Sequence, residues 1–275
     1  MIINMYLWIN FLSLINILKN TMEPLKKFTK DKLKIQIFDS DLSAGLTCAR
    51  FVADNLNEAI QSKGFANLIL ATGASQFAFI DAIKTLDIDW SKITIFHLDE
   101  YKGLPDTHPA SFCKYLKERV IDIVKPRKMY YINGDAEDIE SEIARYEGLL
   151  KAHPVDIACI GIGENGHIAF NDPGVADFND PRLVKIVQLD DACRRQQLGE
   201  GWFSSFNDVP KEAISLTVSA IMACKVISAI VPDKRKAEAV YNTLYAEIST
   251  GCPATILRNH NDATLFLDKY SASKL

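Results

Sequence analysis

Residues Val155–Gly174, VDIACIGIGENGHIAFNDPG, decide how the rest of the chain is interpreted. An apolar run broken only by Asp156 predicts a buried strand, and closely spaced glycines follow it at once. Glycines directly after a core strand let the backbone turn sharply and approach a ligand closely. His167 stands five residues before Asp172 in this loop, which predicts an imidazole oriented by a carboxylate. The alternative is a glycine-rich turn whose polar residues only cap the next helix.

Short apolar segments alternate with amphipathic ones on both sides of this stretch. We expect strands at Lys34–Phe38, Asn67–Leu70, Ile93–Leu98, Met129–Ile132, Val155–Ile160, Leu183–Gln188, Val226–Val231 and Thr264–Leu267. We expect helices at Leu42–Ser62, Ser75–Thr85, Pro109–Val120, Asp138–Lys151, Ile214–Ala223 and Lys234–Glu247. This alternation predicts a single α/β domain with a Rossmann-like, open, mainly parallel sheet and helices on both faces. The polar, irregular segment 175–210 is either a mobile lid or a packed excursion.

The strand at Asn67–Leu70 ends in a loop of small residues that leads into a helix. Backbone N–H groups at Thr72, Gly73, Ala74 and Ser75 would form a cradle for a phosphate. The loop is neither a Walker A motif nor a GxGxxG motif. An ordinary turn with Ser75 as the N-cap of the helix is the alternative.

Two further strand ends carry charged residues. Asp99 and Glu100 follow the strand ITIFHL at the edge where open α/β sheets bind ligands, so one of them is a candidate base, or else a cap or ion-pair partner. Lys234, Arg235 and Lys236 begin a helix, where cations oppose the helix dipole unless they hold an anion. The alternative is a set of solvated side chains on an exposed turn. In a parallel sheet all of these segments line one cleft, which suits proton transfer on a phosphorylated sugar.

Composition restricts the class of protein. The chain has 275 residues, 48% of them hydrophobic, and a net charge of −4, which indicates a globular domain and gives no sign of a nucleic-acid or membrane surface. Its cysteines are scattered and form no CxxC pair: Cys48, Cys113, Cys159, Cys193, Cys224 and Cys252. This pattern favours buried free thiols in a reducing cytoplasm over disulfides or a metal site.

The N-terminus has a different composition. Residues 1–30 are predicted to be an apolar extension, and residues 31–275 the functional domain. The extension lacks a basic segment ahead of its apolar stretch and is short for a membrane span. The sequence from Met22 onward looks like a natural start, so we expect a mis-assigned start; a weak anchor or signal is the alternative.

These motifs together resemble the glucosamine-6-phosphate deaminase (isomerase) family, a relative of the 6-phosphogluconolactonases. The resemblance rests on ATGAS, LDEYKGLPDTHPASF, GIGENGHIAFNDPG, ISLTVSAI, KRKA, CPATILRNH and LDKYSASKL, and it covers the chain from about Leu33 onward. Phe170 and Asn171 favour the deaminase branch over the lactonase branch. The reaction implied is D-glucosamine 6-phosphate plus water giving D-fructose 6-phosphate and ammonia, without a cofactor.

The resemblance also implies catalytic roles. Asp99 matches the acid that moves a proton from the sugar C2 to C1, and His167 matches the histidine that assists ring opening. Asp172 stands in place of a glutamate that supports this histidine. Asn165 stands where other members have an aspartate that pairs with the histidine, and it cannot stabilise an imidazolium by charge. Glu164 is the neighbour that would compensate.

Binding roles follow in the same way. The predicted substrate- and phosphate-binding residues are Thr72, Gly73, Ala74, Ser75, Gly166, Lys236 and Arg194. The resemblance also implies a phosphate-binding arginine, for which Arg194 and Arg195 are the candidates. The resemblance leaves the assembly open, so a homo-oligomer is compatible with it.

Three other functions remain open. The first is a deaminase/isomerase for galactosamine 6-phosphate or another hexose phosphate, because Asn165 and segment 175–210 diverge. A second option is a lactonase. A third is a non-catalytic sugar-phosphate sensor, although residues 1–32 offer no basic helix-turn-helix and Asp99 and His167 are both present.

Overall fold

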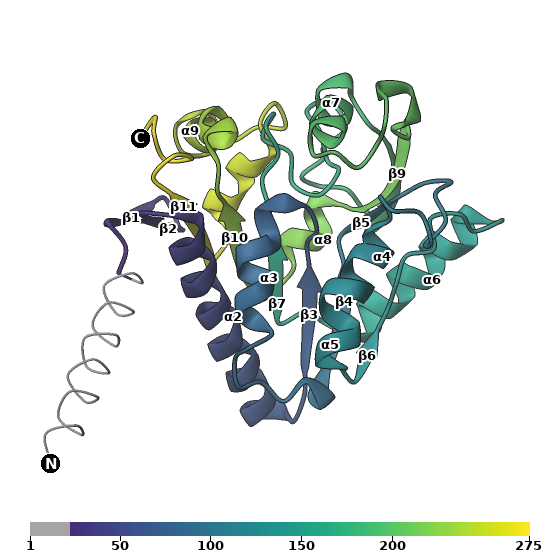
Figure 1. Ribbon diagram of the computed structural model, residues 1–275, viewed down its shortest axis with the longest axis horizontal. Helices are drawn as coiled ribbons and strands as arrows, with labels where there is room; N and C mark the ends of the chain where they lie inside the picture. The colour runs from purple at the N-terminus through teal and green to yellow at the C-terminus, as the bar shows by residue number, and fades with distance from the viewer. Residues whose placement is uncertain (1–22) are drawn as a thin grey trace, which may run out of the picture.

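The main sheet has eight strands in the computed structural model, which describes residues 23–275 (Figure 1). In spatial order the strands are β1 (Lys26–Lys30), β2 (Leu33–Phe38), β11 (Ala263–Asp268), β10 (Val226–Val231), β7 (Ile157–Ile160), β3 (Ala66–Leu70), β4 (Ile93–His97) and β6 (Lys128–Met129). Strand β1 runs antiparallel to β2, and the other neighbouring pairs run parallel. The predicted open, mainly parallel α/β sheet in a single domain is confirmed.

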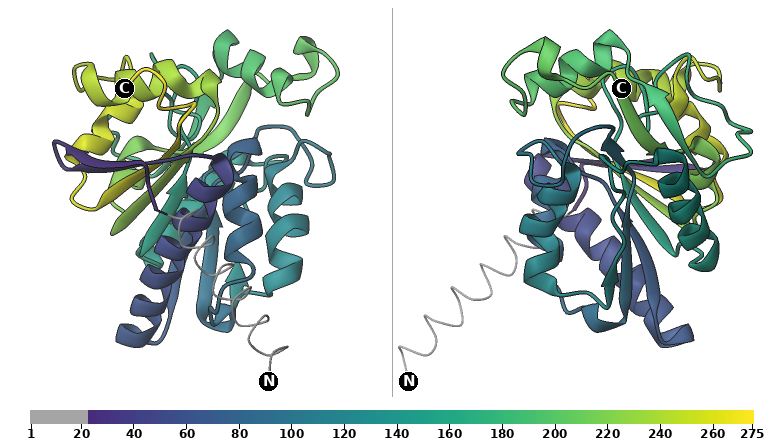
Figure 2. Two further views of the ribbon diagram at one scale, coloured as in Figure 1. Left: turned by 60° about the vertical axis from the view of Figure 1, so that its left-hand side comes forward. Right: turned by 90° about the vertical axis from the view of Figure 1, so that its right-hand side faces the viewer.

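Helices cover both faces of this sheet (Figure 2). One face carries α2 (Asp41–Lys63), α3 (Phe77–Ile83), α4 (Phe112–Leu116), the π-helical turn Lys117–Ile121 and α5 (Asp122–Val124); the other carries α6 (Ile139–Ala152), α8 (Val218–Met222) and α9 (Ala237–Tyr245). Successive side chains of a strand point to opposite faces. Leu68 of β3 therefore packs in the cluster that holds Leu56 of α2, whereas Ile69 packs in the cluster that holds Tyr146 of α6. Strands buried on both faces explain the continuous apolar runs in the sequence.

Helix α2 shows how local sequence determines these elements. Ser40 is its N-cap and accepts a hydrogen bond from the Ser43 N–H, and Gly64 ends it in the left-handed conformation at φ 83°. Gly45 faces α3 so closely that a Cβ there would lie 2.6 Å from the Cβ of Ala78. The sequence thus sets both the ends of α2 and the close approach of α3.

A second, three-stranded antiparallel sheet lies beside the carboxyl ends of the main strands. It consists of β5 (Asp99–Tyr101), β9 (Glu212–Leu216) and β8 (Val184–Gln188). The helix predicted at Ile214–Ala223 is wrong in its first part, because Ile214–Leu216 is buried strand between two neighbours. Thr217 separates strand from helix, since its hydroxyl caps α8 by accepting from the Ala220 N–H.

Segment 175–210 is a packed excursion. It contains β8, α7 (Asp191–Gly199) and the short 3₁₀ turn Phe206–Asp208. Leu189, Cys193, Phe203 and Val209 pack with Tyr101 in a third apolar cluster. The segment therefore covers the end of the main sheet with its own small core.

The N-terminal boundary lies earlier than predicted. Strand β1 pairs along its whole length with β2, so the folded domain includes residues N-terminal to residue 31. The rest of the predicted extension, residues 1–22, lies outside the described residues. From residue 23 onward, the chain contains no helix with the length and apolar character that a membrane crossing requires.

Candidate active site

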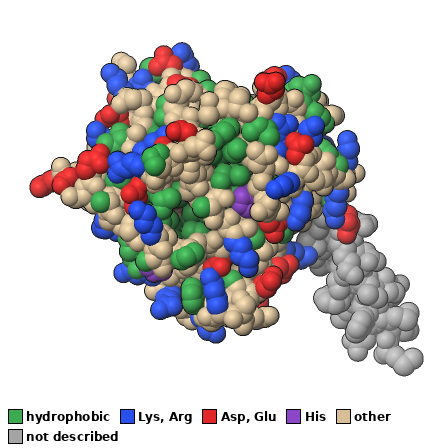
Figure 3. Space-filling view, turned by 180° about the vertical axis from the view of Figure 1, so that it is seen from behind, with side chains coloured by type: hydrophobic (Ala, Val, Ile, Leu, Met, Phe, Trp, Pro, Cys, Tyr) green, Lys and Arg blue, Asp and Glu red, His purple; other side chains and the backbone are tan. Residues whose placement is uncertain are grey.

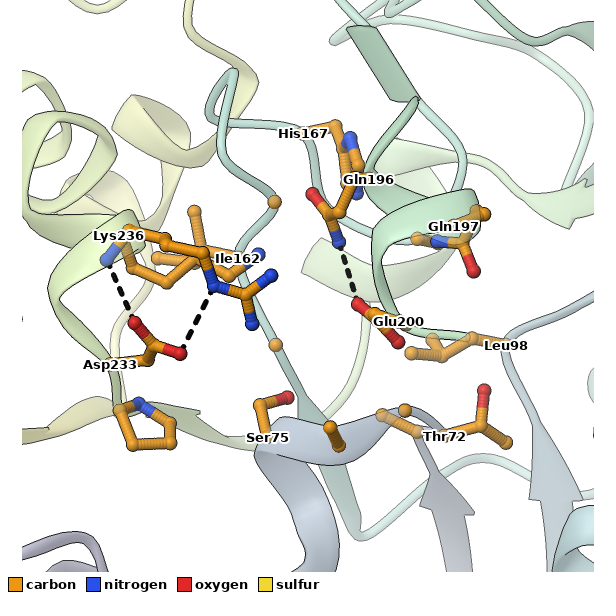
Figure 4. Close-up of a pocket in the computed structure, with 18 of the residues that line it drawn as sticks. Thr72, Ser75, Leu98, Ile162, His167, Gln196, Gln197, Glu200, Asp233 and Lys236 are labelled. Carbon is orange, nitrogen blue, oxygen red and sulfur yellow. Dashed lines mark hydrogen bonds and ion pairs between the residues drawn. The ribbon is translucent and has the colours of Figure 1, made fainter. Parts of the chain in front are cut away.

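A cavity of about 580 Å³ opens at the carboxyl ends of the parallel strands. Figure 4 shows Thr72 and Ser75 on one wall, His167 and Gln196 on another, and Lys236 with Asp233 to the side. Of the predicted site residues, seven line it: Thr72, Gly73, Ala74, Ser75, Asp99, His167 and Lys236. The predicted convergence of separate strand ends is therefore present. Asn165, Gly166, Asp172 and Arg194 lie outside the lining.

Asp99 is a buried acid that lines the cavity. It is the first residue of β5, and 8% of it is exposed. Burial, with the charge of Glu100 as a second cause, raises the pKa of Asp99 from 3.8 to about 8. Within residues 23–275, no side chain or N–H group is hydrogen-bonded to this carboxylate. It is thus free to accept a proton, with a pKa in the range where a general base works best.

Glu100 has a structural role instead. Its carboxylate accepts hydrogen bonds from the Tyr101 N–H at 2.8 Å, the Ser111 hydroxyl at 2.8 Å and the Cys113 N–H at 2.9 Å. The Ser111 and Cys113 donors lie at the start of α4, so Glu100 joins β5 to that helix. Of the two adjacent carboxylates in the sequence, the structure leaves Asp99 for chemistry.

His167 and Asp172 form the second functional unit. His167 Nδ1 lies 2.8 Å from Asp172 Oδ1, and Asp172 is fully buried behind the imidazole. Burial acts to raise the pKa of Asp172, but the contacts with His167, with Asn165 and with the Asp190 N–H hold it below the usual 3.8. The carboxylate therefore stays ionised beside the imidazole.

Glycines in the loop make this geometry possible. A Cβ on Gly163 would lie 2.2 Å from the imidazole of His167, so any larger residue would displace the ring. Gly166 has φ 86°, and a Cβ there would meet the Cys252 sulfur at 2.5 Å. Gly166 thus lets the loop pack closely against Cys252, and it does not line the cavity.

Asn165 contacts the carboxylate of the pair, not the imidazole. Its Nδ2 donates to Asp172 Oδ1 at 3.0 Å, and its Oδ1 accepts from the His167 backbone N–H at 3.0 Å. An aspartate here would place a second negative charge against Asp172. Glu164 does not substitute for it, since its carboxylate lies 3.5 Å from Arg235.

Three of the described residues form a cluster of side chains of the kind that bind metal ions. Within residues 23–275, the ligand atoms of His167, Asp172 and Cys193 lie within 4.8 Å of one another. Both Asp172 oxygens already accept hydrogen bonds, from Asn165 and from the Asp190 N–H. Burial raises the pKa of Cys193, and neighbouring carboxylates add to this, so the thiol keeps its proton. These conditions favour a hydrogen-bonded network over a metal site.

The opposite end of the cavity is suited to an anion. Gly73 has φ 95°, a conformation that favours glycine, just before the 3₁₀ turn Ala74–Gln76. Lys236, in the 3₁₀ turn Lys234–Lys236, is 6% exposed, and burial lowers its pKa against the opposing effect of Glu200. A buried ammonium beside a glycine turn is the environment expected for a phosphate.

The structure does not support the prediction for Arg194. Its Nη2 donates to the carbonyls of Phe206 and Val209 at 2.9 and 3.0 Å, and the guanidinium lies 4.1 Å from the Phe206 ring centroid. These contacts fix α7 to the following turn and leave the side chain buried away from the cavity. The pair RR in the sequence gave no signal of this role.

Sequence reasoning missed the other face of α7. Gln196, Gln197 and Glu200 line the cavity, and Gln196 Nε2 donates to Glu200 Oε1 at 3.2 Å (Figure 4). Gln197 accepts from the Tyr101 hydroxyl at 2.7 Å. The spacing of residues 196 and 200 by one helical turn was the signal available.

Fold and cavity together define a class: an α/β enzyme that combines an acid, an oriented imidazole and an anion cradle at the edge of its sheet. The chain belongs to the family described as glucosamine-6-phosphate isomerases/6-phosphogluconolactonase, whose model matches residues 41–266.

Relatives of known name agree with this membership. The glucosamine-6-phosphate deaminase of Bacillus cereus (strain G9842) is 37% identical over 218 residues, which are 79% of this chain and 81% of the relative. A solved monomeric glucosamine-6-phosphate deaminase superposes with a TM-score of 0.81 at 32% identity, covering 87% of this chain and 98% of the other. The 6-phosphogluconolactonase from Plasmodium vivax shares the fold, with a TM-score of 0.73 at 16% identity over 94% of this chain and 97% of that one.

Proposed function

We propose that the protein converts D-glucosamine 6-phosphate and water to D-fructose 6-phosphate and ammonia. The observation that carries the proposal is that Asp99, His167 and the anion-binding end of the cavity face one space. The deaminase relatives at 37% and 32% identity support the choice of substrate.

His167 would act first in this scheme. The phosphate, held near Ser75 and Lys236, directs the sugar ring toward the imidazole. His167 donates a proton to the ring oxygen as the bond from C1 to that oxygen breaks, and the C1 hydroxyl loses its proton to solvent, giving the open-chain aldehyde. Asp172, 2.8 Å from Nδ1, stabilises the charged imidazole that donates the proton.

Asp99 would then carry out the isomerisation. Its carboxylate removes the proton from C2 and returns it to C1, while the C1 oxygen gains the proton that the amine loses, which leaves a C1 hydroxyl and an imine at C2. Water adds to this imine, and ammonia departs to give the ketone. An unpartnered carboxylate with a pKa of about 8 holds the proton between the two steps without a competing hydrogen bond.

The test is a direct assay of purified protein for ammonia and fructose 6-phosphate. Glucosamine 6-phosphate, galactosamine 6-phosphate and 6-phosphogluconolactone are compared at equal concentration. The proposal requires equal amounts of both products, with glucosamine 6-phosphate preferred. Lactone hydrolysis without ammonia, or binding of sugar phosphate without turnover, would instead favour the lactonase or the sensor.

We further propose a cytoplasmic protein that acts on a small molecule without a nucleic-acid or membrane partner. All six cysteines are buried free thiols, which supports a reducing compartment. Basic and acidic side chains are interspersed over the face in Figure 3, in keeping with the small net charge. Light scattering after size-exclusion chromatography measures whether a homo-oligomer forms.

A further inference from the structure

The positive charge of the cavity comes from one short segment. Among the residues from 23 onward that line it, the basic side chains are Lys234, Arg235 and Lys236. A phosphate monoester carries a charge of about −2 at neutral pH, and it is bound best where a guanidinium adds two parallel hydrogen bonds to an ammonium. Lys236 supplies the ammonium. A guanidinium for the same phosphate would have to come from an arginine that faces the cavity.

The arginines of α7 do not supply it. Arg194 donates to the carbonyls of Phe206 and Val209 and is buried there. Arg195 has a side chain that is 67% exposed, pairs with Asp191 at 3.4 Å and does not line the cavity. Neither Arg194 nor Arg195 lines the cavity that Gly73 and Lys236 line.

Arg235 lines the cavity and is hydrogen-bonded to the neighbouring acid Asp233. Asp233 Oδ1 accepts from the Arg235 backbone N–H at 2.9 Å, and Asp233 Oδ2 accepts from Nε at 3.1 Å. Asp233 has φ 86°, a conformation that non-glycine residues adopt rarely and at an energetic cost. This strained residue thus fixes both the backbone and the side chain of Arg235.

The rest of the guanidinium is available to a ligand. Nη1 lies 3.5 Å from Glu164 Oε1, farther than a direct hydrogen bond, and Nη2 has no hydrogen-bond partner in the part of the chain described. Holding Nε on Asp233 leaves the two Nη groups as a fork of the kind that binds a phosphate.

We propose that Arg235 is the phosphate-binding arginine of this enzyme and that Asp233 is the residue that positions it. This assignment rests on the proposed function, because it requires a phosphorylated ligand. It replaces Arg194 in that role and gives a reason for an aspartate at a position whose backbone favours glycine.

The experiment measures binding of inorganic phosphate and of glucitol 6-phosphate by calorimetry to the full-length protein. Arg235→Gln is expected to weaken both ligands by at least about tenfold, and Arg235→Lys by less, because one charge remains without the fork. In turnover of glucosamine 6-phosphate, KM rises by a similar factor while kcat changes little. Arg195→Gln is the matched control, and its affinities stay within about twofold of wild type.

Asp233→Gly tests positioning, because glycine accepts the backbone conformation. It is expected to weaken phosphate binding by at least about threefold in the wild-type background and to have no further effect in Arg235→Gln. Equal losses of affinity in both backgrounds would contradict a role through Arg235.

The outcomes separate this inference from the proposed function. If wild-type protein binds both ligands but releases no ammonia, the proposed function is wrong. The phosphate affinities of the Arg235 variants then still test the role of Arg235. The inference is overturned if Arg235→Gln binds phosphate as tightly as wild type, or if wild type binds neither ligand. Thermal unfolding of each variant confirms that the fold is intact.

Discussion

Replacing Asp99 with asparagine should stabilise the protein while it removes activity. Burial raises the pKa of Asp99 to about 8 in the folded state, whereas an aspartate in an unfolded chain has its usual pKa of 3.8. A folded-state pKa above the unfolded one gives stability that is fully present below pH 3.8 and is lost as the pH rises through about 8. Asparagine has nearly the same shape and no charge, so it does not show this loss.

The size of the effect follows from the shift. At about 1.4 kcal/mol for each pKa unit, ionised Asp99 destabilises the folded state by about 6 kcal/mol well above pH 8. Between pH 5 and pH 9, the stability of Asp99→Asn relative to wild type should therefore increase by about 4 kcal/mol. Effects of the substitution that do not depend on pH cancel in this difference.

The assay is urea unfolding of both proteins at pH 5, 7 and 9, followed by circular dichroism. The expected result is a stability difference that grows steadily in favour of the variant, with turnover of glucosamine 6-phosphate reduced at least about tenfold. Glu142→Gln is a control, because that buried acid lies outside the cavity. Parallel stability curves for Asp99→Asn and wild type would refute the claim that the folded state holds a desolvated carboxyl group at this position.

Three further predictions concern residues in or beside the cavity. Asp172→Asn keeps the shape of the side chain but loses a charge-assisted contact worth about 1.5–3 kcal/mol, so kcat should fall by about 10- to 150-fold with phosphate affinity unchanged; a kcat within threefold of wild type would contradict this. Gly163→Ala should lower kcat at least about tenfold, because the new Cβ would lie 2.2 Å from the imidazole of His167 and would displace the ring. Unchanged turnover would show that the ring has room to move. Glu200→Gln should tighten binding of inorganic phosphate severalfold in calorimetry, because Glu200 Oε2 lies 3.4 Å from the Cβ position of Gly73; weaker binding would mean that the carboxylate assists the ligand.

The sequence predicts the sheet well because its strands are buried on both faces. Strands such as Ile93–His97 and Val226–Val231 are mainly apolar and buried along their whole length, as a parallel sheet covered by helices requires, so the parallel arrangement and its carboxyl edge follow from the pattern. The helix predicted from Ile214 fails for a related reason. A short apolar run has no decisive period, and strand pairing with β5 and β8 overrides it.

The candidate site likewise contains residues that the sequence predicts and residues that it does not. Asp99, His167 and Lys236 lie in the segments that follow core strands β4, β7 and β10, so their position at the edge of the sheet can be predicted from the sequence. Arg194 and Gln196 are only two residues apart on α7, yet one is buried against Phe206 and the other lines the cavity. Which face of a helix meets a cavity depends on packing with distant residues, and local pattern does not contain that information.

The most direct test of the account follows the C2 hydrogen of glucosamine 6-phosphate by proton NMR during turnover. Wild-type protein should consume this signal as fructose 6-phosphate and ammonium appear together, and Asp99→Asn should leave it nearly unchanged over the same time. Loss of the C2 hydrogen at the wild-type rate in the variant would show that another group moves the proton.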